Sequence, residues 1–571
     1  MRPSKDRGGR GALRASALVP PTLRGYRPAL LRGDVLAGAT VWAVLVPEAI
    51  AYAAIAGVPP VVGLYAAPAA LLLYALLGSS RQLVVGPMSA TAALSAVVVG
   101  GAAATGAGAA ALSAALALAT GAIALAAGLL RLGFLAAFIS QPVLKGFVVG
   151  IALTIIAGQL PELIGVEGAE GEFFAQLAGL AAAAADPHWP TLAVGGCALA
   201  ALLLLKRLLP VFPASLAVVL AGIGATALLS LDRAGVGVVG ALPAGLPALG
   251  PPDVPLGAYA DLAAGAAGIA LVGFAEGLGA AKTYAAETGD TVDTDRELIG
   301  MGGANAAAGL CSGMVVNGSL SKTAVNGAAG ARSQVSGLTA ALLTVVTLLF
   351  LTGLFEKLPQ AVLAAVVIAA VLELIDVRAF RDLYGMATRR LVAVYGPAAR
   401  ADLIAAVAAL LGVLVLGTLR GLLLGVAASL LLLLYRASRP NIAELGRDPR
   451  TGRWTDLSRA PSDEPAPGAL VVRVEGGLFF ADSDRVRERI LAMARERGAR
   501  TVVLDAKTVP FVDATAVRML RELGRRLRAE GAVLAVARDI GQVRDLLGDR
   551  EGLYPDVDTA LREAHRAEGR E

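Results

Sequence analysis

Long apolar segments recur through the first three quarters of the sequence and constrain its fold more than any other feature. Many run for about twenty residues with little or no charge, which is enough for a helix to cross a hydrocarbon layer roughly 30 Å thick. A mean hydropathy of +0.69 and a charged fraction of only 17% exclude a soluble globular protein. The sequence therefore predicts a multi-pass helical membrane protein, which we expect in the plasma (inner) membrane with lipid around it.

The charged and metal-ligating residues exclude several functions. The chain has 50 Lys and Arg against 45 Asp and Glu, a near balance that does not indicate a nucleic-acid partner. Its two cysteines, Cys197 and Cys311, and its two histidines, His188 and His565, provide no Cys/His metal or haem site and no disulfide framework. We therefore expect no cofactor and no bound metal. We also expect no cleavable signal peptide, because the N-terminal residues lack an apolar core.

Apolar segments and loop charges together predict the topology. Lys and Arg fall after the second, fourth, sixth and twelfth segments and in residues 1–33, whereas the loop at 159–190 is acidic and contains no Lys or Arg, so both termini are expected in the cytoplasm. Nearly half of the charged residues lie in 437–571, which predicts a soluble tail. The resulting organisation is a basic arm (1–33), a transmembrane domain (34–436), a linker (437–464) and a tail domain (465–571). The fourteen predicted spans are 36–56, 63–78, 86–100, 108–130, 134–158, 191–206, 212–231, 260–284, 298–313, 317–330, 334–353, 360–376, 401–418 and 420–436.

Two of these segments are too short to cross the membrane and begin with Pro, Gly and hydroxyl residues: 86–91 (GPMSAT) and 317–322 (NGSLSK). Such segments are typical of half-helices that start inside the membrane. They are the third and tenth spans, which are equivalent if the chain is two inverted repeats of seven spans. Two helix N-termini facing one small volume favour an anion there. The alternative is that these small residues only allow helices to pack closely.

Ionisable residues deep within apolar segments are costly and usually line a functional cavity. Glu48 is in the first span, Glu276 in the eighth and Lys322 in the tenth. The alternatives are that Glu48 lies among the headgroups at a span end and that the Lys322 side chain snorkels to the interface.

Six motifs give the sequence a family resemblance: 46–48 (VPE), 63–67 (GLYAA), 74–78 (YALLG), 80–87 (SRQLVVGP), 317–326 (NGSLSKTAVN) and 330–337 (GARSQVSG). With these motifs the sequence closely resembles the sulfate permease (SulP) family of anion transporters, relatives of prestin and pendrin. The resemblance implies an inverted seven-plus-seven repeat, a core domain moving against a gate domain, a C-terminal STAS domain, a homodimer and no enzymatic activity.

The same resemblance implies the site residues. Met88 and Ser89 belong to one half-helix and Gly318, Ser319 and Lys322 to the other, and the remaining residues that line the cavity are Tyr52 and Glu276. Lys322 stands where several relatives have Arg, and a lysine lacks the bidentate fork that recognises an oxyanion geometrically. Relatives carry sulfate, bicarbonate, chloride or dicarboxylates, so the substrate stays open.

The tail independently predicts an α/β domain. Strands are expected at 469–474, 501–505 and 532–536, and helices at 484–497 and 515–529. The segment 513–516 (DATA) resembles the loop-to-helix signature of STAS domains, in which related regulators carry a phosphorylated Ser or Thr. Thr515 is therefore a candidate regulatory residue, and the alternative is simple capping of the helix by Asp513.

These features favour a secondary active transporter of a small inorganic or organic anion that works by alternating access. Glu48 and Glu276 are the candidate coupling residues. Desolvation favours their protonated forms, and the turn after Glu276 offers no oxygen side chains for sodium, so proton symport is preferred to sodium symport. The alternatives are a sodium-coupled bicarbonate symporter, an anion channel or exchanger of the same architecture, and a membrane-tethered regulator that acts through the STAS domain. Residues 319–322 also fit the S-x-x-K motif of penicillin-binding enzymes, but the companion motifs are absent.

Overall fold

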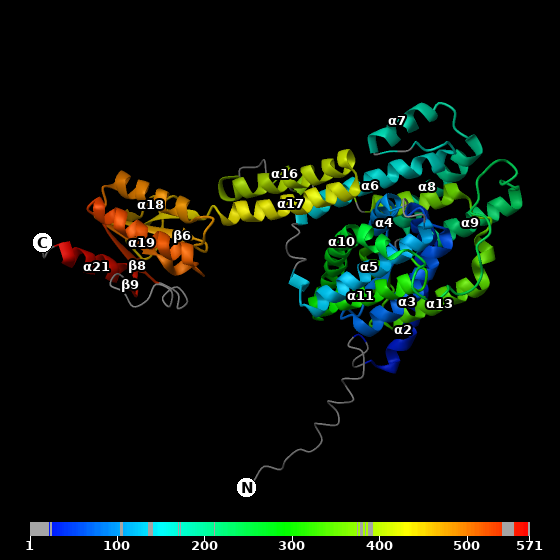
Figure 1. Cartoon of the computed structure of the whole chain (residues 1–571), viewed down its shortest axis with the longest axis horizontal. Helices are drawn as coiled ribbons and strands as arrows, with labels where there is room; N and C mark the ends of the chain where they lie inside the picture. The colour runs from blue at the N-terminus through cyan, green and yellow to red at the C-terminus, as the bar shows by residue number, and fades with distance from the viewer. Residues whose placement is uncertain are drawn as a thin grey trace, which may run out of the picture. The chain divides into compact units, whose positions relative to one another are not determined.

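The protein, seen in a computed structural model, consists of two compact units, Met1–Ser429 and Leu430–Glu571 (Figure 1). The described residues do not include the basic residues of the arm up to Arg24, nor Arg389 and Arg390. The structure describes residues 22, 26–102, 107–134, 141–169, 171, 173–209, 212–373, 375, 376, 378, 381, 382, 384, 385, 392–538 and 553–568.

The first unit is helical apart from two short strands. Its elements are η2 (Pro28–Leu30), α2 (Leu31–Ile55), α3 (Pro60–Leu77), β1 (Val84–Gly86), α4 (Ser89–Gly101), α5 (Ala109–Leu129), α6 (Gln141–Ile164), α7 (Phe173–Ala183), α8 (Trp189–Leu208), α9 (Ala214–Leu229), α10 (Leu256–Thr288), α11 (Thr294–Leu310), β2 (Asn317–Ser319), α12 (Leu320–Ala328), α13 (Val335–Val346), η5 (Thr347–Leu351), η6 (Thr352–Phe355), α14 (Gln360–Leu372) and α16 (Val392–Leu416). Helix α17 (Thr418–Ala437) continues from this unit into the second.

Each of the fourteen predicted segments contains a helix in the described part of the chain. Among these residues, seven helices are long and apolar enough to cross a membrane, and α4, α9 and α14 are shorter apolar helices. The number of membrane crossings therefore stays a prediction. The structure differs from the prediction at 159–190, where α6 continues past Pro161 to Ile164 and α7 adds a short helix with no buried residue.

The helices form two groups that mix the two halves of the sequence. Helices α3 and α5 pack on α11, and α2 packs on α13, whereas α6 packs on α14 and α16 (Figure 1). Small residues permit the closest approach: a Cβ added at Gly302 of α11 would lie 2.6 Å from the backbone nitrogen of Leu125 in α5. This grouping agrees with the core and gate domains that the resemblance implies.

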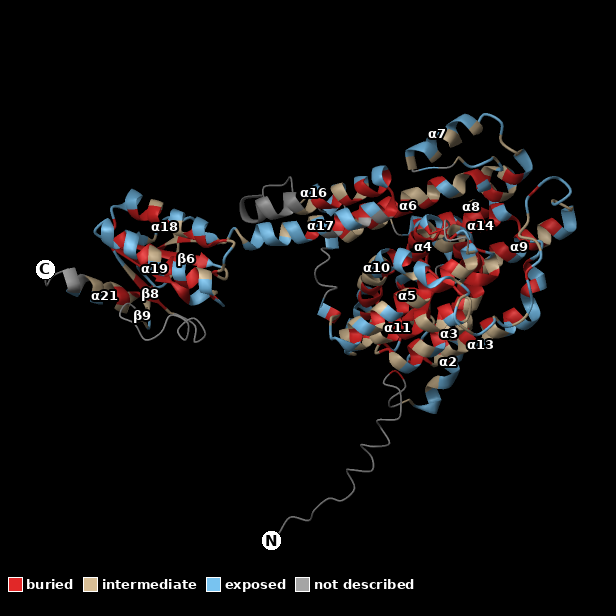
Figure 2. Ribbon diagram, in the orientation of Figure 1, coloured by how far each residue is buried: buried red, intermediate tan, exposed pale blue. Residues whose placement is uncertain are grey.

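Burial differs between the inside and the outside of the helical unit. Figure 2 shows buried residues gathered where helices face one another. Large apolar side chains also cover outer surfaces, such as Leu228 on α9, 85% exposed, and Phe350 in η5, 76% exposed. An apolar exterior of this kind suits a hydrocarbon surrounding, because lipid tails are as apolar as these side chains.

The two short strands join the two halves of the chain. β1 and β2 pair antiparallel, with Val84 opposite Ser319, Val85 opposite Gly318 and Gly86 opposite Asn317. Helix α12 begins directly after β2, and α4 begins three residues after β1 ends. Both half-helices therefore begin beside one shared ladder of backbone hydrogen bonds.

The second unit is an α/β domain built on a seven-stranded sheet with the path β4-β3-β6-β7-β8-β9, in which β5 also pairs with β3. Strands β6 to β9 are parallel, and β3 is antiparallel to β6. Its elements are β3 (Asn441–Arg447), β4 (Trp454–Asp456), β5 (Glu464–Pro465), β6 (Ala469–Glu475), α18 (Ser483–Arg497), β7 (Thr501–Asp505), η7 (Ala506–Thr508), α19 (Ala514–Ala529), β8 (Val533–Ala537), β9 (Leu553–Tyr554) and α21 (Val557–Glu568).

Alternation along the strands places helices on both faces of this sheet. Leu470 and Val472 of β6 join the apolar core under α18 and α19, whereas Val471 joins the core under α21. At the carboxyl end of β7, the fully buried Asp505 accepts hydrogen bonds of 2.8 Å from the Nε atoms of both Arg473 and Arg538. Three of the strands, β3 to β5, fall at least partly within residues 437–464, which the sequence analysis treats as a linker.

Candidate anion-binding site

The start of each half-helix places the predicted site residues. Met88, in extended conformation, is the N-cap of α4, and Ser89 is its first residue. Ser319 caps α12, and its Oγ accepts a hydrogen bond of 3.3 Å from the backbone nitrogen of Lys322. Gly318 lies in β2 between Asn317 and this cap. The first-turn N–H groups of a helix lack intrahelical partners and favour negative charge, as an anion site requires.

Lys322 and Glu48 form a buried ion pair. The Nζ atom of Lys322 lies 2.7 Å from Oε2 of Glu48, and the two side chains are 1% and 5% exposed. The same Nζ donates to the carbonyl oxygen of Pro87, at 3.1 Å, just before α4. Neither a headgroup position for Glu48 nor a snorkelling Lys322 agrees with this burial. The ammonium group that the sequence analysis assigned to the anion is thus partly neutralised by the carboxylate assigned to ion coupling.

Tyr52 connects this ion pair to the other half-helix. Its ring centroid lies 5.1 Å from Nζ of Lys322, within the range of a cation–π contact. Its hydroxyl interacts with the side chains of Glu48, one turn earlier on α2, and Ser89. The structure therefore brings Glu48, Tyr52, Ser89 and Lys322 into one buried cluster.

Glu276 lies on α10, a helix that packs against both β2 and α12. It is half-buried on α10, and its Oε2 atom is buried with no hydrogen-bond partner among the described residues. A Cβ added at the next residue, Gly277, would lie 3.5 Å from the Cα of Gly318, so α10 runs close beside the β2 segment of the site.

Three side-chain amides bond to backbone carbonyls across the two halves of the chain, and we call this set the amide brace: Gln82, Asn326 and Gln334. Asn326 donates to the carbonyl of Gln82 at 2.9 Å, and Gln82 donates to that of Ala331 at 2.9 Å. Gln334 donates to the carbonyls of Ser80 and Leu83 at 3.0 and 2.8 Å. Sequence reasoning missed these roles, although all three residues belong to the motifs that carry the family resemblance.

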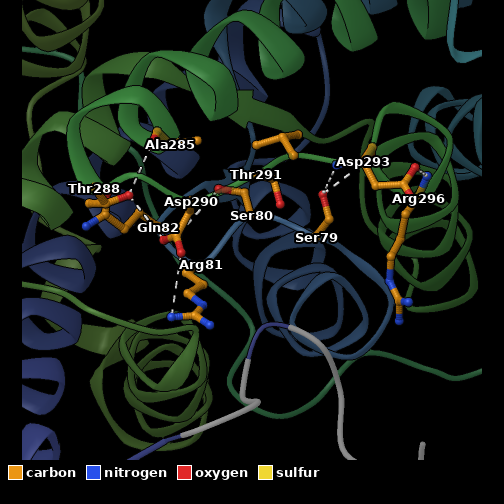
Figure 3. A pocket seen from close by; sticks show the side chains of 11 residues that line it. Ser79, Ser80, Arg81, Gln82, Ala285, Thr288, Asp290, Thr291, Asp293 and Arg296 are labelled. Atoms are coloured by element: carbon orange, nitrogen blue, oxygen red, sulfur yellow. Dashed lines mark hydrogen bonds and ion pairs between the residues drawn. The ribbon is translucent and has the colours of Figure 1, made fainter.

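A polar cavity of about 280 Å³ lies outside the predicted site, between the α3–β1 and α10–α11 connections (Figure 3). Its charged groups are engaged locally: Arg81 pairs with Asp290 at 3.7 Å, and Asp293 caps α11. Just behind it, the buried Glu297 accepts hydrogen bonds from the hydroxyl of Tyr74 and from the backbone and side chain of Ser79. These bonds tie α11 to the segment that leads into β1.

We expect Ser319→Pro to abolish anion binding. Proline removes the backbone N–H of this residue and disturbs the cap of α12, both at the proposed binding surface. Calorimetric titration of the purified protein with sulfate tests this, with Ser462→Pro, in an exposed turn of the second unit, as the control. Equal affinities in the wild type and Ser319→Pro contradict the site.

Thr515 lies in the second unit, half-buried in the first turn of α19. Asp513 caps this helix, since its Oδ1 accepts a hydrogen bond of 2.8 Å from the backbone nitrogen of Ala516. Nearby, burial raises the pKa of Asp482, and the negative charge of Asp513 adds to the rise. A phosphate on Thr515 would gain from the helix N-terminus but meet the charge of the capping residue.

We therefore expect Thr515→Asp to change the transport rate more than the substrate affinity. The comparison is the maximal rate and KM of uptake in proteoliposomes containing the wild type, Thr515→Asp or Thr515→Ala. Unchanged rates in both variants leave helix capping as the only role of this segment.

The fold and the site define a multi-pass membrane transporter for anions with a C-terminal α/β domain. Residues 31–397 match the sulfate permease family and residues 460–562 match the STAS domain. The chain belongs to the sulfate permease family, which is a family of transporters and not of enzymes.

Curated relatives of this chain are sulfate transporters. It is 40% identical to the probable sulfate transporter MT1781 of Mycobacterium tuberculosis (strain CDC 1551 / Oshkosh), over 92% of each chain. It is 31% identical to the probable sulfate transporter 3.4 of Arabidopsis thaliana, over 91% of this chain and 82% of the relative.

Solved structures share the fold. The murine anion transporter Slc26a9 in its inward-facing state has a TM-score of 0.84 at 22% identity, covering 99% of this chain and 96% of that one. The transmembrane domain of the cyanobacterial bicarbonate transporter BicA has a TM-score of 0.60 at 23% identity, covering 70% of this chain and 98% of that one.

Proposed function

We propose that this protein is a secondary active transporter that carries sulfate together with protons across the plasma membrane by alternating access. The names of its relatives favour sulfate among the anions that the sequence leaves open. The observation that carries the proposal is the buried pair of Lys322 and Glu48 beside the starts of α4 and α12. A homodimer with both termini in the cytoplasm is part of the proposal.

Charge compensation links the proton to the anion in this proposal. While Glu48 is ionised, it balances the charge of Lys322, and an incoming anion must compete with a carboxylate 2.7 Å away. Protonation of Glu48 removes that competitor and leaves Lys322 and the two helix N-termini to the anion. By linkage, an anion that binds there favours the proton on Glu48 by the same factor. Proton and substrate therefore bind together.

A sodium-coupled bicarbonate symporter is the second candidate: BicA, described as a bicarbonate transporter, shares the fold and favours the anion of this alternative, but not its coupling ion. A sodium site needs several hard oxygen ligands. The residues that follow Glu276 on α10 include Gly277, Gly279 and Ala280, which offer no side-chain oxygen. The arrangement of side chains therefore favours protons.

Uptake into proteoliposomes tests the proposal. The full chain is reconstituted and offered labelled sulfate, bicarbonate, chloride or fumarate, each with and without imposed proton and sodium gradients. We expect saturable sulfate uptake that accelerates as external pH falls and that needs no sodium. A strict requirement for sodium would mean that Glu276 belongs to a sodium site. A current that is linear in voltage would indicate a channel. Obligatory countertransport of a second anion would indicate an exchanger. No flux of any anion favours a membrane-tethered regulator.

A further inference from the structure

A small cavity lies beside β2, next to the backbone that leads into the proposed anion site. The volume open to the centre of a water-sized molecule in this cavity is about 10 Å³. Its walls come from α5, α10, α11 and β2. The lining residues that matter below are Thr120, Gly273, Met301, Asn305 and Asn317.

Two buried polar atoms on the cavity wall have no hydrogen-bond partner among the described residues. They are Oγ1 of Thr120 and Nδ2 of Asn317, and both residues are 2% exposed. Leaving a buried donor or acceptor unsatisfied is costly, so such groups are normally bonded to protein or to ordered water. The neighbouring Asn305 has its bonds, because its side chain pairs with both the backbone nitrogen and the carbonyl of Val316. The two unsatisfied atoms thus stand out on an otherwise paired wall.

We propose that this cavity binds one water molecule, which accepts a hydrogen bond from Asn317 and donates one to Thr120. The available room is about that of a single water, and a buried water needs two to four polar partners. The Asn317 group that lines the cavity is an N–H donor, so it disfavours a cation.

The water acts on the anion site through Asn317, and this role rests on the transport function proposed above. The other side-chain atom of Asn317, Oδ1, accepts a hydrogen bond of 2.8 Å from the backbone nitrogen of Gly318, next to the Ser319 cap. Gly273 leaves room for the Asn317 side chain, since a Cβ at Gly273 would lie only 3.1 Å from the Cγ atom of Asn317. Thr120 is therefore a positioning residue, which fixes the start of α12 through the water and Asn317.

Radiolytic footprinting of the purified full-length protein detects the water without any transport assay. Hydroxyl radicals formed from a bound water oxidise the nearest methionine, and in labelled water they introduce its oxygen isotope. Met301 lines the cavity although it is only 4% exposed, whereas the fully buried Met314 does not line it and serves as the internal control. We expect rapid oxidation of Met301 in the wild type and loss of that oxidation in Gly273→Ala. Oxidation of Met301 as slow as that of Met314 in the wild type overturns the proposal.

Transport kinetics then test the positioning role. We expect Thr120→Val to raise the KM for sulfate about five-fold with little change in kcat, the effect of one lost hydrogen bond. Thr120→Ser keeps the hydroxyl group, so its KM for sulfate should equal that of the wild type. The control is Thr226→Val on α9, where a buried hydroxyl already bonds to the carbonyl of Gly222. An unchanged KM in Thr120→Val overturns the positioning role, whereas absence of uptake in the wild type contradicts the proposed function and leaves the footprint as an independent result.

Discussion

Replacing Glu48 with glutamine is expected to make sulfate uptake independent of external pH. Glutamine resembles the protonated carboxylic acid in size and charge, so Lys322 keeps its position but loses its buried counter-charge, 2.7 Å away in the wild type. The anion then binds without a proton, and a proton gradient no longer drives accumulation. The measurement is the initial rate of labelled sulfate uptake in proteoliposomes across a range of external pH, with and without a proton gradient.

Two further variants determine which carboxylate carries the proton. Glu276→Gln removes the other candidate coupling carboxyl, and Glu162→Gln alters an exposed carboxyl near the end of α6 and serves as the control. We expect loss of pH dependence in Glu48→Gln and a wild-type profile in Glu162→Gln. A flat profile in Glu276→Gln alone places the proton on Glu276 instead. A wild-type pH profile in both Glu48→Gln and Glu276→Gln contradicts proton coupling through either residue.

Lys322→Ala is expected to reduce both anion affinity and stability. The variant removes a positive charge from the site and leaves the carboxylate of Glu48 buried without its partner. Breaking a buried ion pair on one side typically costs about 3–5 kcal/mol, much more than loss of an exposed pair. Calorimetric titration with sulfate measures the affinity, and the thermal unfolding midpoint of the detergent-solubilised protein measures the stability.

The double variant Glu48→Gln/Lys322→Ala separates the two effects. Without a buried charge to compensate, the protein should recover most of the lost stability, whereas anion affinity should stay low because the cation is still missing. Recovery of affinity in the double variant would show that Lys322 acts only as the partner of Glu48.

Helices and strands were predictable from the sequence where burial produces a long apolar segment or a regular alternation of apolar and polar residues. The apolar segments of the first unit all contain helices, and the strands and helices predicted for the tail match β6 to β8, α18 and α19 within a residue or two. The short β3 to β5 strands escaped prediction, because β3 reads as the mixed sequence N-I-A-E-L-G-R and β5 has only two residues. β3 pairs with β6, and β4 and β5 pair with β3, so these strands depend on tertiary contacts rather than on a local sequence pattern.

The sequence named candidate site residues but did not predict their contacts. Charge inside apolar segments singled out Glu48, Glu276 and Lys322, because burial of such groups is costly wherever they lie. The pairing of Lys322 with Glu48 arises from tertiary structure, since nothing local to either residue indicates the other. β1 and β2 were missed for the same reason, as three-residue strands carry no periodicity.

The amide brace has a consequence for how the chain is made. Gln334 bonds to the backbone of Leu83 across 251 residues of sequence, and Asn326 bonds to Gln82 across 244. During synthesis, the non-helical backbone around β1 enters the bilayer long before these partners exist, and unsatisfied backbone groups are not tolerated in hydrocarbon. The first seven segments are thus an incomplete folding unit, and a ribosome paused midway through this chain exposes a half that needs a chaperone, retained water or delayed insertion.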